Sequence, residues 1–359
     1  MTSQFSIQNA RQGKPCQEWS WIHKHFGNVT AELTRSDGCI QLQLEMAGVE
    51  VVLQLEGVSD NSDMIRMTAS ELHQKASLGS VRGGVALKRL VVLQVLDVLF
   101  SACPTIRIIE VNDAMLAWLP NGILSDHRLS RSGFYQWPEL WLAKGVEYPM
   151  AQQQVKSGEV RHPKRPSHPR GELYRRYLPS LKQTLSFRVI DPVQDLQTFH
   201  RWMNMPGIAP IWELGKPEAE LQKYLVDRQS DPHIFSVIGC FDDEPFGYFE
   251  FYWAMEDRLG PYYDPLPFDR GVHLLVGNRR YLGAHHFKAW LLGLNHYLFL
   301  DDPRTQRVMG EPRADNKKLL RYLEYFPCYR KLKEFDFPHK RAALMECDRD
   351  RLFDGEVLS

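Results

Sequence analysis

Two apolar runs joined by a short polar turn constrain the fold of this chain more than any other feature of its sequence. Residues 234–241 and 246–253 are rich in β-branched and aromatic side chains, and the polar stretch 242–245 separates them. This pattern predicts a β-hairpin. Because side chains alternate across a strand, Glu250 and Tyr252 lie on one face of it. A carboxylate in that position is a candidate pocket residue.

The segments after the hairpin alternate between strands and helices. We expect strands at 272–276 and 307–309, helices over 284–299 and 316–326, and two final strands at 332–337 and 341–347. This order of elements predicts an α/β or α+β fold with a mixed sheet.

The first 155 residues repeat this pattern more weakly. Apolar and polar residues alternate over 40–45 and 51–55, with a turn at Gly48, which predicts two half-buried strands. A helix that ends near residue 100 follows the turn at Gly83-Gly84, and a strand follows at 106–109.

Residues 156–172 hold three prolines, two glycines and five Lys or Arg residues without any apolar period. Such a segment is typical of a solvated linker, with a basic lid or an anion-binding strip as the alternative. Because 359 residues are too many for one compact core, we expect an N-terminal domain, 1–155, and a C-terminal domain, 173–359.

The two domains show an internal similarity. A shift of 199 residues places Gly84 on Gly283 and Pro104 on Pro303, and it aligns the Leu-Phe pairs at 99–100 and 298–299. We hypothesise that the N-terminal domain is a degenerate copy of the C-terminal one. The hypothesis requires a shared strand order.

The charge balance excludes two classes of protein. Lys plus Arg and Asp plus Glu each number 44, and apolar residues make up 43% of the chain. A disordered chain has lower hydrophobicity and higher net charge, and a globally basic nucleic-acid binder needs a surplus of cations. We therefore expect a folded protein that does not bind nucleic acid.

The sequence also predicts a cellular compartment. It has no basic start followed by an apolar run, so we expect no secretory signal. The most apolar stretch, 85–100, is short and carries charges, which argues against a membrane span. Six cysteines without a CxxC pair indicate neither a disulfide framework nor a zinc site. We expect a cytoplasmic protein without a metal ion.

The turn that begins at Arg279 and Arg280 is a candidate anion site. Its small residues, Gly283 and Ala284, allow a ligand to approach the N-terminus of the following helix, which begins near His285. Free N–H groups and the helix dipole favour phosphate at such a position. An ordinary turn is the alternative.

His273 and Glu311 are candidate catalytic residues. His273 lies on the strand before this turn, and a neutral imidazole accepts a proton near pH 7. Glu311 ends the strand at 307–310, at the edge where ligands bind in α/β sheets. A structural histidine and a surface charge are the alternatives.

Aromatic and acidic residues form a further group. We expect a pocket for a cationic, aliphatic substrate, lined by Trp202, Glu250, Tyr252, Trp253 and Asp257. A packed aromatic core is the alternative for each of them. The basic cluster at 338–341 suits an anionic ligand.

Several longer motifs together resemble one known family. They are Phe199-His200-Arg201-Trp202-Met203-Asn204, Glu244-Pro245-Phe246-Gly247-Tyr248-Phe249-Glu250, Asp269-Arg270-Gly271-Val272-His273-Leu274, Gly310-Glu311-Pro312-Arg313-Ala314-Asp315-Asn316 and Asp336-Phe337-Pro338-His339-Lys340-Arg341. Over 171–353 the chain resembles the acyl-CoA-dependent N-acyltransferases of hydroxamate siderophore biosynthesis, in the GNAT superfamily. The resemblance implies the GNAT fold, with a mixed and mostly antiparallel sheet.

The resemblance also implies the ligands and the residues that bind them. The donor is an acyl-CoA, either acetyl-CoA or succinyl-CoA, and its pyrophosphate lies on the turn 279–285. The implied contacts to the pantetheine and the rest of the donor are Leu274, Leu275, Val276 and Asn316, and His200 and Asn204 join the substrate site. His273 and Glu311 match the proposed catalytic pair of related lysine acyltransferases.

Two positions depart from the family pattern. His285 stands where the superfamily usually has Gly or Ala, and Pro327-Cys328 replaces the usual Gly-Phe after the last helix. Neither change touches the catalytic pair.

The implied reaction is acyl transfer to an N-hydroxylated amine, hydroxylysine or a hydroxydiamine, by direct attack in a ternary complex. His273 is the expected general base, and Glu311 orients the acceptor or relays the proton. Carboxylates such as Glu250 or Asp257 would bind a remote cationic amine. No cysteine is placed for a covalent acyl-enzyme.

Two other functions stay open. The first is a GNAT enzyme that acts on another primary amine, such as a protein N-terminus, a lysine side chain or an aminoglycoside. The second is a non-catalytic acyl-CoA-binding or assembly protein. The resemblance also implies contact with other enzymes of the siderophore pathway, and the oligomeric state stays open.

Overall fold

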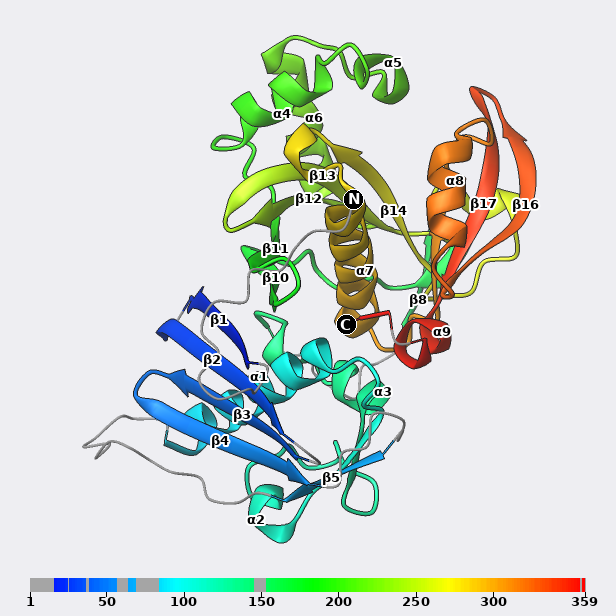
Figure 1. Ribbon diagram of the computed structural model, residues 1–359. Helices are drawn as coiled ribbons and strands as arrows, with labels where there is room; N and C mark the ends of the chain where they lie inside the picture. Colours follow the sequence, from blue (N-terminus) through cyan, green and yellow to red (C-terminus); the bar gives the residue numbers. More distant parts are fainter. Residues whose placement is uncertain are drawn as a thin grey trace. The chain divides into compact units, whose positions relative to one another are not determined.

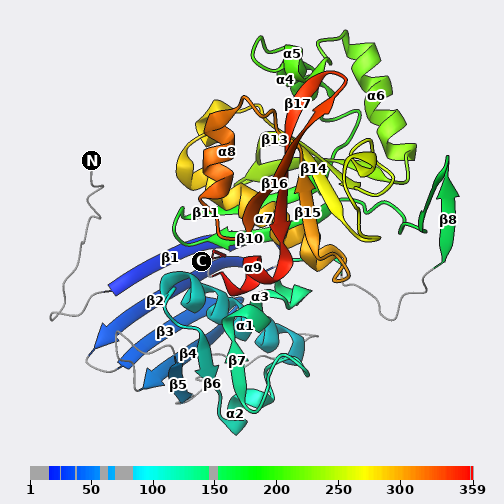
Figure 2. The ribbon, with the colours of Figure 1, turned by 90° about the vertical axis from the view of Figure 1, so that its right-hand side faces the viewer.

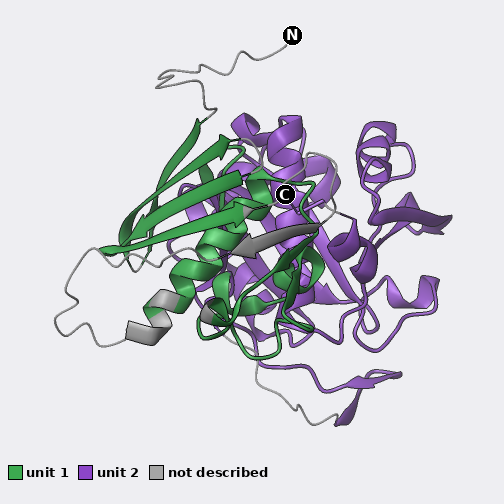
Figure 3. Cartoon of the chain, turned by 60° about the horizontal axis from the view of Figure 1, so that its bottom comes forward, with its two compact units in different colours: residues 1–140, 177–183, 359 green, residues 141–176, 184–358 purple. Residues whose placement is uncertain are grey.

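The computed structural model describes residues 16–24, 26–36, 39–56, 64–68, 84–144, 153–355 and 357–358. The chain forms two compact units, which Figure 3 draws in different colours. Unit 1 comprises residues 1–140, 177–183 and 359, and unit 2 comprises residues 141–176 and 184–358.

Unit 1 holds a sheet in the strand order β1-β2-β3-β4-β5-β6-β7. Its strands are β1 (Cys16–His23), β2 (Gly27–Ser36), β3 (Cys39–Met46), β4 (Val49–Glu56), β5 (Met64–Thr68), β6 (Ile108–Glu110) and β7 (Arg128–Ser130). Its helices are α1 (Gly84–Ala102), α2 (Asp113–Leu116), α3 (Arg131–Tyr135) and the 3₁₀ turn η1 (Pro138–Leu140).

The local patterns in unit 1 gave correct elements. The alternating segments 40–45 and 51–55 lie within β3 and β4, and the alternation appears as buried Leu42 and Leu44 between more exposed polar residues. Gly48 turns between the two strands at φ +76°, a conformation that glycine adopts without strain. The predicted helix is α1, and the predicted strand at 106–109 overlaps β6.

Unit 2 holds a larger sheet in the order β10-β11-β12-β13-β14-β15-β17-β16. Its strands are β10 (Glu172–Leu178), β11 (Gln183–Val189), β12 (Ile234–Phe241), β13 (Glu244–Trp253), β14 (Arg270–Val276), β15 (Arg307–Gly310), β16 (Tyr329–Phe337) and β17 (Lys340–Asp348). Its helices are α4 (Leu196–Met203), α5 (Ala209–Trp212), α6 (Glu218–Ser230), α7 (Ala284–Asp301), α8 (Lys317–Glu324) and α9 (Arg349–Asp354), with 3₁₀ turns η2 (Gly260–Tyr262) and η3 (Arg279–Tyr281).

The predicted hairpin is β12 with β13, and its turn is made by Asp242 and Asp243 at φ 48° and 64°. Short polar residues tolerate this left-handed conformation, which matches the twist of a hairpin. Side chains on both faces of β12 and β13 are buried. On one face Tyr248 packs with residues of α4 and α6, and on the other Phe249 packs against Trp290 of α7.

The parallel strands β14 and β15 lie side by side in the middle of this sheet, and they are paired over only a short stretch. The pairing between β14 and β15 is confined to Arg270 with Val308 and Gly271 with Met309. From Val272 to Val276, β14 pairs with β13 on its other side. The edge of β14 that faces away from β13 therefore keeps backbone groups for a ligand. Figure 1 shows β14 beside α7.

The segment predicted as a linker overlaps the hairpin of β8 (Gln154–Ser157) and β9 (Val160–Pro163), and Figure 2 shows β8 set apart from the larger sheet. The guanidinium of Arg165 is buried, pairs through Nε and Nη2 with both carboxylate oxygens of Glu256, and lies over the ring of Trp253 at 4.4 Å. Unit 2 accordingly begins at Trp141 rather than at 173. The basic, proline-rich composition predicts a solvated segment, because composition alone does not show that Arg165 pairs with the buried Glu256.

The two units share a strand order. Consecutive strands lie side by side from β1 to β5 and from β10 to β14, and a helix, α1 or α7, then leads to a parallel strand. An antiparallel strand, β7 or β17, follows on its far side. This is the order that the duplication hypothesis requires. Unit 2 adds α4 to α6, α8 and β16.

None of the helices in the described ranges combines the length and the apolar character that a membrane-spanning helix needs.

Candidate active site

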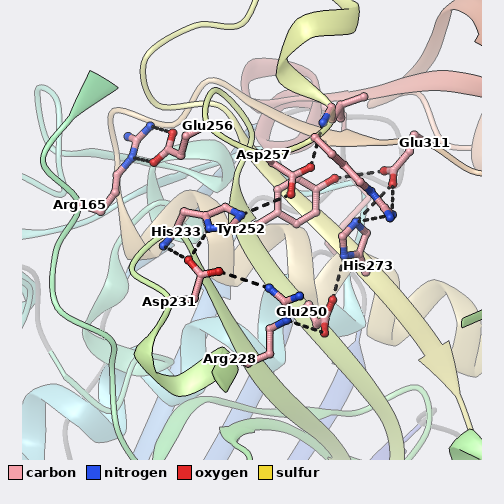
Figure 4. Close-up of polar contacts among 12 residues, drawn as sticks. Arg165, Arg228, Asp231, His233, Glu250, Tyr252, Glu256, Asp257, His273 and Glu311 are labelled. Atoms are coloured by element: carbon pink, nitrogen blue, oxygen red, sulfur yellow. Dashed lines mark hydrogen bonds and ion pairs between the residues drawn. The ribbon is translucent and has the colours of Figure 1, made fainter. Parts of the chain in front are cut away.

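His273 on β14 lies directly opposite Glu250 on β13. The Nδ1 atom of His273 is 2.9 Å from Oε2 of Glu250. The ring of Tyr252 lies 4.6 Å from the imidazole, between centroids. Glu250 and Tyr252 thus both contact His273, as their predicted position on one face of the strand requires. Figure 4 shows the three side chains together.

Glu250 is held by the protein on both of its oxygens. Its Oε1 accepts a hydrogen bond from the hydroxyl of Tyr248 at 2.9 Å and another from Tyr224 of α6. The side chain is 3% exposed, and Arg228 Nε lies 3.9 Å from Oε1. Although burial opposes the charge, the hydrogen bond and the charge of His273 hold the pKa of Glu250 below its usual range.

Glu311 follows β15 and approaches the other side of the imidazole. Its Oε1 is 3.3 Å from Nε2 of His273, and its Oε2 accepts a hydrogen bond from Tyr252 at 3.1 Å. Arg258 Nη2 donates to Oε1 at 3.2 Å, and Lys340 Nζ lies 3.8 Å from the same oxygen. Burial opposes ionisation, but the charge and the hydrogen bond of His273, followed by the charges of Lys340 and Arg258, hold the pKa of Glu311 far below its usual range.

The two carboxylates set the protonation of His273. Burial alone would lower the pKa of His273, but Glu311 and Glu250 outweigh it and raise that pKa to about 9. About one ring in a hundred is then neutral at pH 7. In the neutral ring Nδ1–H donates to Glu250, and Nε2 accepts from Arg258 Nη2 at 3.2 Å. The sequence predicts a His273 that is neutral near pH 7, whereas in the structure the two carboxylates raise its pKa above that range.

The predicted phosphate turn keeps groups that suit an anion. Gly283 precedes α7, no side chain caps the helix, and a methyl group added at Gly283 would meet nothing within 4 Å. Arg279 and His285 are exposed, as is Ala284, whereas Arg280 is paired with Glu244 at 3.0 Å. Burial, then the charges of His285 and Arg280, lower the pKa of His286, so the surroundings are cationic. An uncapped, cationic helix start fits a pyrophosphate.

The acetyltransferase (GNAT) domain model matches residues 191–337 of the chain. N(6)-hydroxylysine O-acetyltransferase from Escherichia coli is 47% identical over 228 residues, which are 63% of this chain and 71% of that protein. A putative lysine N-acyltransferase from Schizosaccharomyces pombe is 45% identical over 63% of this chain and 67% of its own length. The N(5)-hydroxyornithine:cis-anhydromevalonyl coenzyme A-N(5)-transacylase of Beauveria bassiana is 42% identical over 54% of this chain and 43% of its own length.

The chain belongs to the GNAT acyltransferases. The predicted GNAT fold, with its mixed and mostly antiparallel sheet, is thereby confirmed, and so is the predicted enzyme class, an N-acyltransferase. The predicted siderophore branch of the family is confirmed by relatives that are named after hydroxylysine and hydroxyornithine. Enzymes of this family take their acyl group from acyl-CoA.

Two tryptophans predicted for the substrate site of this GNAT enzyme are core residues. Trp202 of α4 is 2% exposed and packs against Gly277 and the cluster under α4 and α6. Trp253 is 4% exposed and lies between the guanidinium groups of Arg165 and Arg270. Neither ring has surface left for a substrate, because both side chains are almost fully buried.

The predicted substrate carboxylates are also occupied. Glu250 is engaged by His273 and by tyrosine hydroxyls. Asp257 is buried, accepts from the backbone N–H of Leu259 at 3.0 Å and lies 3.5 Å from His233 Nε2. Both carboxylates are buried and already hydrogen-bonded, so their contact with a remote cation on the substrate stays a prediction.

The remaining predicted residues have local structural contacts. Asn204 ends α4 and donates to the carbonyl oxygens of His200 and Lys216. Asn316 caps α8 by accepting from the N–H of Leu319. On β14, Leu275 is buried, and Leu274 and Val276 are half-buried along the strand whose edge is open.

Three residues of the site escaped the sequence analysis. Tyr224 and Arg228 come from α6, and Arg258 comes from the loop between β13 and β14. None lies in a motif, and each meets the site through contacts that span 15 or more residues of sequence. The identification of Lys340 as part of a basic cluster was the one sequence signal for a cation beside Glu311.

One group of metal-type ligands occurs in the described residues, namely Cys16, Glu18 and Glu32. Partial burial and the neighbouring Glu32 raise the pKa of Cys16 to about 11.

Proposed function

We propose that the protein transfers an acyl group from acyl-CoA to the nitrogen of an N-hydroxylated amine and so forms a hydroxamate in siderophore biosynthesis. The observation that carries the proposal is the contact of half-buried His273 on β14 with the two buried carboxylates Glu250 and Glu311, in a chain 47% identical to an N(6)-hydroxylysine O-acetyltransferase. The acceptor nitrogen carries a hydroxyl group and is largely neutral at pH 7.

The donor would lie along the open edge of β14. Its pantetheine amides would pair with backbone groups near Leu274 and Val276, and its pyrophosphate would meet the uncapped start of α7 at Gly283 and Ala284. Arg279 and His285 are exposed beside this helix start and would add positive charge. This placement puts the thioester next to His273, because His273 precedes Leu274 on the same strand.

The reaction would be a direct attack in a ternary complex. The acceptor nitrogen forms a bond to the thioester carbon, the carbon–sulfur bond breaks, and the nitrogen loses its proton to Nε2 of neutral His273. Glu250 accepts a hydrogen bond from Nδ1–H and so keeps the ring proton on Nδ1, and Glu311 orients the acceptor. The proton then passes to the departing CoA thiolate. Holding both reactants in line supplies about 7–11 kcal/mol in well-oriented cases.

The test is a matrix of acyl-CoA donors against paired acceptors, with hydroxamate measured by mass spectrometry and thiol release followed in parallel. Acetyl-CoA and succinyl-CoA serve as donors, and each N-hydroxylated amine is compared with its plain amine. We expect product from the N-hydroxylated member of each pair. Equal or faster acylation of the plain amines would contradict the proposal and favour a GNAT enzyme for other amines. The identity of the acyl group, the cytoplasmic location and contact with other siderophore-pathway enzymes stay predictions.

A further inference from the structure

Arg258 presents an unused half of its guanidinium group beside the proposed base. Its Nη2 donates to Glu311 Oε1 and lies 3.2 Å from His273 Nε2. Among the described residues, no protein group accepts a hydrogen bond from its Nε or Nη1. The side chain is 51% exposed. An exposed guanidinium N–H group can donate a charge-assisted hydrogen bond to a carboxylate oxygen.

The other accessible charges near Arg258 are mostly positive. Arg258 and Lys340 both lie over the ring of Phe337, at 5.8 Å and 5.5 Å from its centroid. Burial, followed by the charges of Arg258 and Lys340, lowers the pKa of His339, and Glu213 acts in the opposite direction. Glu213 is exposed on this side, in the segment after α5.

The acids nearest to the base are enclosed. Glu250, Glu311 and Asp257 are 3%, 5% and 8% exposed, and each accepts hydrogen bonds from protein groups. A reactant that approaches His273 therefore meets the exposed guanidinium of Arg258 before it meets a free carboxylate. A remote ammonium group on a hydroxydiamine would gain nothing from this arrangement, whereas a carboxylate would gain a charge-assisted hydrogen bond.

We propose that Arg258 is a specificity residue that binds a carboxylate carried by one of the two reactants. The proposal rests on the proposed function, since it concerns the reactants of that transfer. The carboxylate has two sources, the α-carboxylate of an amino-acid acceptor and the distal carboxylate of a dicarboxylic acyl group such as succinyl. In both cases the anion accepts a hydrogen bond from the free Nη1 group while Nη2 stays on Glu311.

The acceptor arm compares N6-hydroxylysine with N-hydroxycadaverine, which differs from it by the loss of the α-carboxylate, and acetyl-CoA is the donor. The donor arm compares succinyl-CoA with acetyl-CoA on N-hydroxycadaverine. Each arm gives a ratio of kcat/KM values. A merely structural or electrostatic effect of Arg258 on His273 changes all rates together and leaves both ratios unmoved.

The variants are Arg258→Gln and Arg258→Lys, with Arg313→Gln as the matched control. Arg313 is 49% exposed and pairs with Asp315 instead of the proposed base. In the wild type we expect the carboxylate-bearing reactant of one arm to be favoured about 10- to 100-fold. Arg258→Gln removes the preference, Arg258→Lys keeps part of it because it retains the charge but reaches the anion from a different position, and Arg313→Gln keeps all of it.

The outcomes show which reactant carries the carboxylate, and they also show whether the proposal fails. Loss of the preference in the acceptor arm identifies an amino-acid acceptor, and loss in the donor arm identifies a dicarboxylic acyl group. A wild type without preference in either arm, or a preference that Arg258→Gln retains, overturns the proposal while the proposed function stands. The absence of hydroxamate from every pair overturns the proposed function and this proposal with it.

Discussion

Replacing Glu250 with Gln removes the charge beside Nδ1 of His273 and keeps the size of the side chain. Neutral His273 is the proposed base, so activity of the wild type rises with pH through the pKa of His273, about 9, and levels above it. An opposite charge in hydrogen-bond contact raises a histidine pKa by about 1–3. Loss of the Glu250 charge at 2.9 Å therefore lowers the midpoint of the pH–rate profile by about 1 or more.

The same change weakens the base in a second way. A carboxamide that keeps its oxygen on the hydroxyl of Tyr248 turns its N–H groups toward Nδ1 of His273. The ring proton then moves to Nε2, which loses the lone pair that accepts the proton from the acceptor. General base catalysis contributes about 10²- to 10⁴-fold. We expect kcat on the alkaline plateau to fall about 10²-fold, with KM for acyl-CoA unchanged.

The assay follows thiol release and hydroxamate formation from about pH 6 to about pH 10, a range that brackets the expected midpoints. Glu172→Gln is the control, because its carboxylate pairs with Arg175 at 2.7 Å and it should keep the midpoint of the wild type. A Glu250→Gln enzyme with the midpoint and plateau of the wild type would refute the assignment of Glu250 as a positioning residue. Activity of the wild type that falls as the pH rises above about 9 would show that the imidazolium is the active form.

Two further predictions concern stability and are measured by urea unfolding. Gly277→Ala places a methyl group 2.3 Å from the ring of Trp202. This overpacking lowers the free energy of unfolding by about 1–3 kcal/mol. The control is Gly283→Ala, where the space is open, and it changes the free energy of unfolding by less than about 0.5 kcal/mol. Arg165→Met removes the main counter-ion of buried Glu256, which keeps only His162 Nδ1 at 3.4 Å, and this loss costs about 3–5 kcal/mol. The exposed Arg161→Met is close to neutral. A Gly277→Ala variant as stable as its control would contradict the close contact with Trp202. An Arg165→Met variant as stable as its control would contradict the buried pair with Glu256.

The elements that could be predicted from the sequence are those fixed by local patterns. The hairpin of β12 and β13, the strand that bears His273 and the helix α7 follow from apolar runs, turn residues and a glycine before the helix. Side-chain alternation also put Glu250 and Tyr252 on one face, and the structure brings both to His273. These inferences depend only on residues that are close to one another in the sequence.

The errors come from contacts between distant parts of the chain. Trp202 and Trp253 are aromatic residues near the site in sequence motifs, but packing against Gly277 and between two arginines buries them. The contact of Glu250 with a cation on the substrate stays a prediction, and the cation that Glu250 contacts in the structure is His273. Arg258 has no pattern around it, because its place beside Glu311 depends on a loop conformation.

The most direct test of the account is hydroxamate formation by His273→Ala beside its binding of acyl-CoA. The account predicts that kcat falls about 10²- to 10⁴-fold, because the group that accepts the proton is gone. It also predicts that acyl-CoA binds as to the wild type, because the strand edge and the start of α7 are unchanged. A variant that turns over at the rate of the wild type would contradict the assignment of His273 as the base.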